Sequence, residues 1–270
     1  MADIHHPRSV GPSTFLIGGG WDRGAVAAVY GPFVRAAAAR AAGRAPRIGC
    51  VVLDEGDGAA QFARYEPVLR EAGDCAPVPV LVPLGGRFAP AAVLDGVDGL
   101  LVCGGLTPAY QEAFAADAAP TVALLAERGI PYAGFSAGAA LAARDAVVGG
   151  WRADGVAVCP EDAGEDLDEV AVRPGLGLVP FAVDVHAAQW GTLPRLATAV
   201  AAGRAGWGVA LDENTVIEVA PGEREGEGEG SGVAVTVAGL GRAHTVRRAP
   251  DGAGVLVRSY GAGASFPVNG

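Results

Sequence analysis

A serine between two glycines is the strongest chemical signal in this sequence. Ser136 stands in the pentapeptide Gly-Phe-Ser-Ala-Gly at residues 134–138. A serine hydroxyl becomes an effective nucleophile only when a turn exposes it, a base takes its proton and donors face the developing oxyanion. Gly134 and Gly138 lack the side chains that would clash in so tight a turn. The motif therefore predicts a nucleophile at Ser136.

The flanking residues strengthen this prediction, because such a short motif arises by chance in a chain with 42 glycines. An apolar run at 131–134 predicts a buried strand, and an Ala-rich segment from about Ala137 predicts a helix. Strand, turn and helix form the context that supports the motif. Ala137 would then present its backbone N–H at a helix N-terminus, where negative charge is stabilised.

The candidate bases are the four histidines, His5, His6, His186 and His244. A neutral imidazole can take the hydroxyl proton and return it to a leaving amine. The first two lie in a segment, residues 1–13, that reads as a loose N-terminal arm. His186 follows an apolar run ending at Val183, and by itself it could equally be an ordinary partly buried histidine.

The elements that must position these residues follow an alternating pattern. Between residues 14 and 147, short apolar runs alternate with longer Ala-rich amphipathic segments, which is typical of βαβ units and a parallel sheet. The predicted strands are residues 15–17, 47–53, 78–82, 99–103 and 131–134. The predicted helices are residues 25–42, 59–72, 90–94 and 108–128.

After Gly149 the pattern changes to shorter strand-like runs, at 156–158, 206–211, 215–219, 233–237 and 254–258. We expect these runs to extend the same sheet as added antiparallel strands or hairpins. Residues 161–169 form an acidic, loop-like stretch, and residues 221–232 alternate Gly and Glu as a surface loop would. The sequence thus predicts one α/β domain over residues 14–270, a doubly wound, mostly parallel sheet flanked by helices.

Composition excludes several classes of protein. With 30 acidic and 20 basic residues, the net charge of -10 has the wrong sign for gripping a nucleic acid backbone. The four cysteines form no Cys-x-x-Cys pair, so neither a zinc site nor a disulfide framework is indicated. No apolar run of about 18 residues occurs, so we expect no membrane span. We expect a cytoplasmic protein that needs no metal or organic cofactor.

Three further stretches stand in a recognisable order with the serine motif: Val-Cys-Gly-Gly at 102–105, Asp-Val-His at 184–186 and Leu-Asp-Glu-Asn-Thr at 211–215. Together they resemble the cyanophycinase and aspartyl dipeptidase (dipeptidase E) family of serine peptidases. That family is a branch of the class I glutamine amidotransferase-like fold. The resemblance runs from about Leu16 to Val219, and a glutamine amidotransferase proper would carry cysteine at position 136.

The resemblance implies a role for each matched residue. Ser136 would be the nucleophile, His186 the general base and Glu213 the acid that orients the histidine. Gly105 and Ala137 would supply the oxyanion donors. The neighbouring Asp212 competes with Glu213 for the orienting role, and the choice of Glu213 follows from the family pattern alone.

The substrate-binding positions depart from the family pattern. The candidates are Thr107, Asp184, Gln189 and Arg195, of which Asp184 could instead orient His186 or Ser136, or only cap the next segment. Arg195 is the one counterpart of the family's basic residues after the histidine, and it could equally be a solvated helix residue. We expect a peptidase, dipeptidase or isopeptidase acting on a small peptide or amino-acid amide and releasing a small or acidic unit. The oligomeric state stays open, with a homodimer as one option.

Other readings of the same residues remain. An α/β-hydrolase esterase would use Ser136, Asp212 and His244, although no His-Gly-Gly-Gly-like segment lies upstream. A catalytically inactive binding module on the same fold is a second alternative. The glycine loop at 18–24 does not fit a dinucleotide site, because Arg23 stands where the third glycine is required. We expect these glycines to let the backbone approach the active-site rim.

Overall fold

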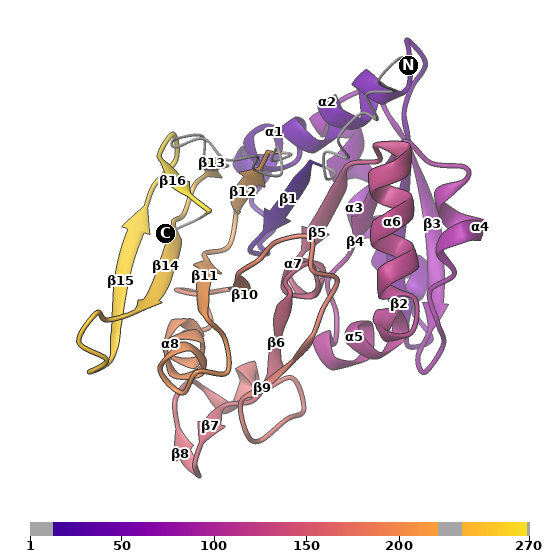
Figure 1. Ribbon diagram of the computed structural model, residues 1–270. Helices are drawn as coiled ribbons and strands as arrows, with labels where there is room; N and C mark the ends of the chain where they lie inside the picture. Colours follow the sequence, from indigo (N-terminus) through magenta and orange to yellow (C-terminus); the bar gives the residue numbers. More distant parts are fainter. Residues whose placement is uncertain (1–12, 221–233, 269–270) are drawn as a thin grey trace, which may run out of the picture.

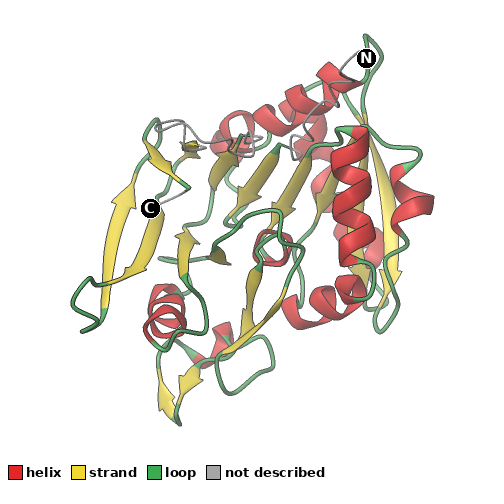
Figure 2. Ribbon diagram, viewed as in Figure 1, coloured by secondary structure: helices red, strands yellow, loops and turns green. Residues whose placement is uncertain are grey.

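The computed structural model describes residues 13–220 and 234–268, and its centre is an eight-stranded sheet in the order β16-β13-β12-β1-β5-β4-β2-β3 (Figures 1 and 2). Strands β1, β5, β4, β2 and β3 pair in parallel, whereas β12, β13 and β16 continue the sheet antiparallel. The predicted fold class is confirmed. The strands are β1 (Thr14–Ile17), β2 (Arg47–Asp54), β3 (Ala76–Pro83), β4 (Gly99–Val102), β5 (Tyr132–Phe135), β12 (Thr215–Val219), β13 (Ala234–Gly239) and β16 (Ser265–Pro267).

Both faces of this sheet are buried, as a doubly wound fold requires. Alternate residues of β1 show this: Leu16 packs into one apolar cluster, and Phe15 and Ile17 pack into another. The helices around this sheet divide between the two clusters, which accounts for the continuous apolar runs of the central strands, whereas α8 (Leu193–Ala201) packs into a third cluster. The helices are η1 (Arg23–Ala25), α1 (Val26–Val29), α2 (Gly31–Arg40), α3 (Gly58–Ala72), α4 (Pro90–Leu94), α5 (Thr107–Ala115), α6 (Ala118–Arg128), α7 (Ala137–Leu141) and α8 (Leu193–Ala201).

Two predicted helices are each divided in the structure. The segment 25–42 contains α1 and α2, and the segment 108–128 contains α5 and α6. Pro32 lies in the first turn of α2, and Pro120 lies in the first turn of α6. Proline lacks the N–H for an intrahelical bond and clashes with the preceding turn, so it is favoured at a helix start and rare further inside, although α3 accommodates Pro67. Continuous helices were therefore wrong at both places.

The C-terminal part forms a second sheet, in the order β10-β11-β14-β15. The prediction that all later strands extend one sheet is thus correct for β12 and β13 and wrong for β8, β11 and β15. The chain leaves β11 through a short turn in which Asn214 adopts a left-handed φ of 56°, and this turn redirects it into the first sheet as β12. The remaining strands are β10 (Ala182–Asp184), β11 (Trp207–Leu211), β14 (Ala243–Arg248) and β15 (Val255–Tyr260), and the small pairs β6 (Asp145–Gly149) with β9 (Ala171–Pro174) and β7 (Arg152–Ala153) with β8 (Val156–Ala157).

This arrangement brings three strand ends together. Ser136 follows β5, His186 follows β10 and Glu213 follows β11, so each candidate stands just beyond the carboxyl end of its strand. Ligands of open α/β sheets bind at this edge. The acidic stretch at 161–169 begins with the 3-10 turn η2 (Glu161–Ala163). Residues 1–12 of the predicted arm at 1–13 and the whole predicted loop at 221–232 lie outside the described residues.

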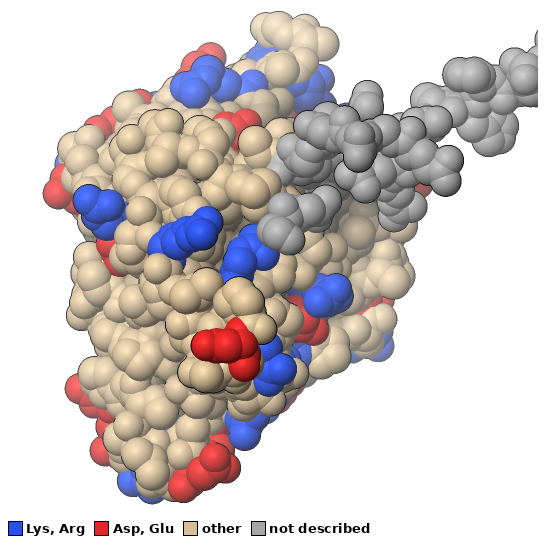
Figure 3. All heavy atoms as spheres, turned by 60° about the vertical axis from the view of Figure 1, so that its left-hand side comes forward, with Lys and Arg blue, Asp and Glu red and all other residues tan. Residues whose placement is uncertain are grey.

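The molecular surface carries both signs of charge. On the face shown in Figure 3, acidic and basic side chains lie singly or in small groups among uncharged residues. Within the described part of the chain, no helix has both the length and the apolar character needed to cross a membrane.

Candidate active site

Ser136 occupies a strained turn between β5 and α7. Its φ of 51° lies in the left-handed region, which non-glycine residues adopt rarely and mostly where function requires it. A Cβ atom at Gly134 would lie 2.3 Å from the carbonyl oxygen of Gly138, and one at Gly138 would lie 2.1 Å from that of Val102. Both glycines are therefore required by close backbone approach, as the sequence motif predicted.

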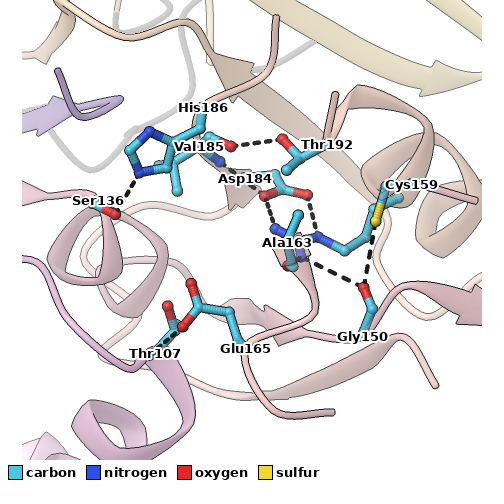
Figure 4. A network of polar contacts seen from close by, with 11 residues as sticks. Thr107, Ser136, Gly150, Cys159, Ala163, Glu165, Asp184, Val185, His186 and Thr192 are labelled. Carbon is cyan, nitrogen blue, oxygen red and sulfur yellow. Dashed lines mark hydrogen bonds and ion pairs between the residues drawn. The ribbon is translucent and has the colours of Figure 1, made fainter. Parts of the chain in front are cut away.

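Ser136 and His186 are in direct contact (Figure 4). Ser136 Oγ lies 2.8 Å from His186 Nε2. On the other side of the imidazole, His186 Nδ1 lies 2.8 Å from Glu213 Oε1. When Nδ1 carries the proton and its N–H donates a hydrogen bond to the carboxylate, Nε2 is the acceptor for the serine hydroxyl. The three residues that the family resemblance selected thus form one hydrogen-bonded array, with geometry suited to proton transfer.

The imidazole of His186 is enclosed on two sides. A Cβ atom on Gly19 would lie 2.1 Å from His186 Cε1, so the first glycine loop must lack a side chain at this point. On the other side the Trp190 ring stacks on the imidazole with centroids 3.9 Å apart and an interplanar angle of 8°. The expected role of these glycines, close approach to the active-site rim, agrees with this packing.

Burial sets the protonation of His186. Desolvation lowers the pKa of the imidazole, while the hydrogen bond and charge of Glu213 act in the opposite direction. The net shift is downward from 6.5, so the neutral form that accepts a proton is present at neutral pH. Histidine in this state is a competent general base.

The position of Glu213 is fixed by its own backbone. Its N–H donates to Gln189 Oε1 at 2.8 Å, and the N–H of the next residue, Asn214, donates to the Gly19 carbonyl at 2.7 Å. Gln189, a predicted substrate-binding residue, therefore contacts the turn that carries the orienting acid.

Asp184 and Arg195, two other predicted substrate-binding residues, form a buried ion pair. Arg195 Nη2 and Nε lie 2.7 and 2.9 Å from the two carboxylate oxygens of Asp184, and the exposed fractions of the two side chains are 4% and 1%. Arg195 also donates to the carbonyls of Gly150 and Ala163 (Figure 4). Asp184 raises the pKa of Arg195 against the effect of burial. Neither residue lines the cavity at Ser136.

A cavity of about 960 Å³ opens at Ser136 and His186. One wall is aromatic: Trp21 contacts Tyr65 and Phe135, each with ring centroids 4.9 Å apart. The volume is large enough for a small peptide. The cavity is lined by Trp21, Leu53, Glu55, Asp57, Gln61, Arg64, Tyr65, Gly104, Gly105, Leu106, Phe135, Ser136, Trp151, Glu161, Asp162, Gly164, Glu165, Asp166, Leu167, Asp168, His186 and Trp190.

Of the two predicted oxyanion donors, Gly105 lines the cavity that opens at Ser136, and Ala137 follows Ser136 directly in the chain. Gly105 lines the cavity with a φ of 152°, and the preceding N–H, that of Gly104, donates to the Tyr65 hydroxyl at 2.8 Å. Ala137 is the first residue of α7, and the first N–H groups of a helix have no acceptor within it. Both N–H groups therefore stand at places where an oxyanion could be held.

Thr107, the last predicted substrate-binding residue, is buried and lies behind the cavity wall. Its N–H donates to Glu165 Oε2 at 3.0 Å, which places this carboxylate at the start of α5 (Figure 4). Sequence reasoning noted the acidic stretch at 161–169 but not its place. Glu165, Trp190 and Arg64 were all missed as cavity residues. The concentration of carboxylates at 161–169 was a signal for Glu165, and no motif pointed to Trp190 or Arg64.

His244 is engaged away from Ser136. Its Nε2 lies 3.2 Å from Asp212 Oδ1 and its Nδ1 lies 2.7 Å from Ser259 Oγ, across the β14–β15 pair. Neither His244 nor Asp212 lines the cavity. The array needed for the esterase alternative, Ser136 with His244, is therefore not formed. Within residues 13–220 and 234–268, no group of three or more potential metal ligands comes together.

Comparison with known proteins adds one firm result. No family model and no curated protein matches the chain, but solved structures do. The crystal structure of a peptidase from an acI-B1 actinobacterium matches over 96% of this chain and 98% of that chain, with 15% identity and a TM-score of 0.62. This chain has the fold of that peptidase. The family resemblance drawn from the motifs is thus confirmed at the level of the fold.

A second solved structure is more distant. A putative peptidase E from Listeria monocytogenes EGD-e matches 85% of this chain and 99% of that chain, with 13% identity and a TM-score of 0.49.

Proposed function

We propose that this chain is a serine hydrolase that cleaves the amide bond of a small peptide or isopeptide through an acyl-enzyme on Ser136. The supporting observation is the continuous array from Ser136 Oγ through His186 to Glu213, with both contacts at 2.8 Å, at the edge of a large cavity. Such an array is recognised by geometry and roles rather than by order in the sequence. The fold shared with a peptidase supports the same reaction class.

The first half of the reaction forms the acyl-enzyme. Ser136 Oγ attacks the carbonyl carbon while His186 Nε2 takes the hydroxyl proton, and the Glu213 carboxylate stabilises the resulting imidazolium. The N–H groups of Gly105 and Ala137 hold the oxyanion. Collapse of the tetrahedral intermediate breaks the C–N bond, and His186 returns its proton to the departing amine.

The second half restores the enzyme. A water molecule takes the place of the amine, His186 removes its proton, and the hydroxide attacks the acyl carbon. The C–O bond to Ser136 breaks, the serine regains the proton and the acid product leaves. All proton transfers use a single histidine, so the reaction needs no further titrating group.

A serine-directed fluorophosphonate tests the proposal with a matched control within the chain. Ser259 also contacts a histidine, at 2.7 Å, but it is exposed on β15 and does not line the cavity at Ser136. We expect the reagent to label the wild type and Ser259→Ala but not Ser136→Ala, as measured by intact mass. A dipeptide and isopeptide library, with β-aspartyl members, should be cleaved by the same two proteins. Equal labelling of Ser136→Ala and wild type would exclude Ser136 as the nucleophile.

A further inference from the structure

The cavity at Ser136 has a strongly uneven charge. Five carboxylates come from the single stretch 161–168 and two more, Glu55 and Asp57, come from the loop after β2. The one lining residue with a permanent positive charge is Arg64. Excess charge of one sign in a cleft focuses the field on whatever enters it.

In the described part of the chain, salt bridges do not neutralise these carboxylates, although the charge of Arg195 acts on Glu165 from outside the cavity lining. Among the described residues, none of the seven forms a salt bridge, although carboxylates elsewhere, such as Asp98 and Asp117, pair with arginines. Arg64 forms no salt bridge among the described residues, and its guanidinium lies over the Trp21 ring, 4.4 Å from the centroid. The cavity therefore presents unpaired negative charge next to the proposed nucleophile.

Glu165 is the most enclosed member of this set. Its Oε2 accepts the Thr107 N–H at the start of α5, which holds the side chain in place. Burial is the main cause that raises the pKa of its carboxyl group. A carboxylate short of solvation gains more from a nearby cation than one in open water does.

We propose that the cavity selects substrates that carry a cationic group, an ammonium or guanidinium, and discriminates against acidic ones. This inference rests on the proposed function, because it takes the cavity as the substrate site of Ser136. The substrate charge proposed here is opposite to that of the acidic unit expected from the sequence. The carboxylates at 161–168 hold the cation, with Glu165 as the enclosed contact.

A series of three matched substrates tests this charge preference. Otherwise identical dipeptides and isopeptides carry Lys, norleucine or Glu on either side of the scissile bond, so that chain length stays similar while charge changes. At low ionic strength we expect kcat/KM to be about tenfold higher for Lys than for norleucine, with Glu lowest, and the ratio to shrink as salt is added.

Variants localise the effect. Glu165→Gln should reduce the Lys-to-norleucine ratio of kcat/KM about five- to tenfold, because it removes the enclosed negative charge. Asp162→Asn, at an exposed lining position, should reduce it about twofold without threatening the fold. Glu127→Gln removes the same charge from the exposed face of α6, outside the cavity, and should leave the ratio as in the wild type.

The outcomes separate this inference from the proposed function. If the fluorophosphonate labels Ser136 but the Glu substrate is cleaved as well as norleucine or better, the charge preference is wrong and the hydrolase stands. If nothing is labelled or cleaved, the hydrolase proposal fails. Calorimetric titration of Ser136→Ala with the same three peptides then still decides the preference, because binding does not require the serine.

Discussion

Two serine–histidine–carboxylate arrays occur in the described part of the molecule, and they differ in almost everything except their residue types. Ser136, His186 and Glu213 meet at the cavity edge, whereas Ser259, His244 and Asp212 meet across a strand pair. His244 and Ser259 are opposite each other in the β14–β15 register, so their contact is an ordinary cross-strand pair. Contact alone is not sufficient for catalysis.

The surroundings of the two serines explain the difference. Ser136 is held at a positive φ ahead of a helix N-terminus, and Ser259 lies within an extended strand with an exposed side chain. The first position is followed by the N–H groups at the start of α7, which could stabilise an oxyanion. The two carboxylates differ as well, because Asp212 already accepts the N–H groups of Ala188 and Arg242. Asp212 thereby ties the segment after His186 to β14.

The largest expected effect comes from removing each histidine. His186→Ala should reduce kcat/KM at least about 10³-fold, because no other group takes the Ser136 proton. His244→Ala should change kcat/KM less than about threefold and should mainly affect thermal stability. Steady-state kinetics and thermal melts of the two variants measure both. Loss of activity only in His244→Ala would reverse the assignment and favour the esterase array.

The two neighbouring carboxylates give the next contrast. Glu213→Gln should reduce kcat about 10²- to 10⁴-fold, because the amide no longer stabilises the imidazolium. Asp212→Asn should retain most activity and lose about 1 kcal/mol of unfolding free energy, since one part-buried donor loses its charged acceptor. Comparable losses of kcat in both variants would show that Asp212 also supports the base.

The pH profile sharpens this second contrast. The base works in its neutral form, so kcat/KM rises with pH through the pKa of His186, which burial places below 6.5. Glu213 raises that pKa, so Glu213→Gln should move the acid limb of the profile to lower pH even as the plateau falls. Asp212→Asn should leave the limb where it is in the wild type. A shift of the Glu213→Gln limb to higher pH contradicts this account.

The sequence predicted the array of Ser136, His186 and Glu213 better than it predicted the residues around that array. Motif order located Ser136, His186 and Glu213, because each stands at a strand end where local pattern and turn glycines are informative. The same reasoning could not distinguish a cavity residue from a buried ion pair at Asp184 and Arg195. Whether two charges find each other depends on how α8 packs against β10, which no local pattern records.

The fold shows the same limit. The parallel strands were located because burial on both faces gives continuous apolar runs. The division of later strands between two sheets was missed, because alternation identifies a strand but not its partner. The turn at Asn214 takes the chain from β11 in the second sheet to β12 in the first sheet. Its distinguishing feature is a left-handed backbone conformation, which the strand patterns do not reveal. The acidic residues at 161–168 could not be assigned to the cavity from the sequence either, because they line it from a loop that is distant in the chain from Ser136.

Substitution of Trp190 has the smallest predicted effect and tests whether the indole ring sets the environment of His186. Its ring covers one face of His186, and His244 has no such ring contact among the described residues. Trp190→Ala should reduce kcat/KM about two- to tenfold, the range expected for losing one stacked pair. Water would then reach the imidazole, so the pKa of His186 should rise and the acid limb should move to higher pH, opposite to Glu213→Gln.

Trp190→Phe is the matched control, because it keeps a ring over the imidazole and should show a smaller shift in the same direction. A role in substrate packing alone would raise KM without moving the limb. If the profile of Trp190→Ala coincides with that of the wild type, the ring does not set the protonation of His186. The downward pKa shift would then come from the Gly19 side, where the backbone of the first glycine loop approaches the imidazole most closely.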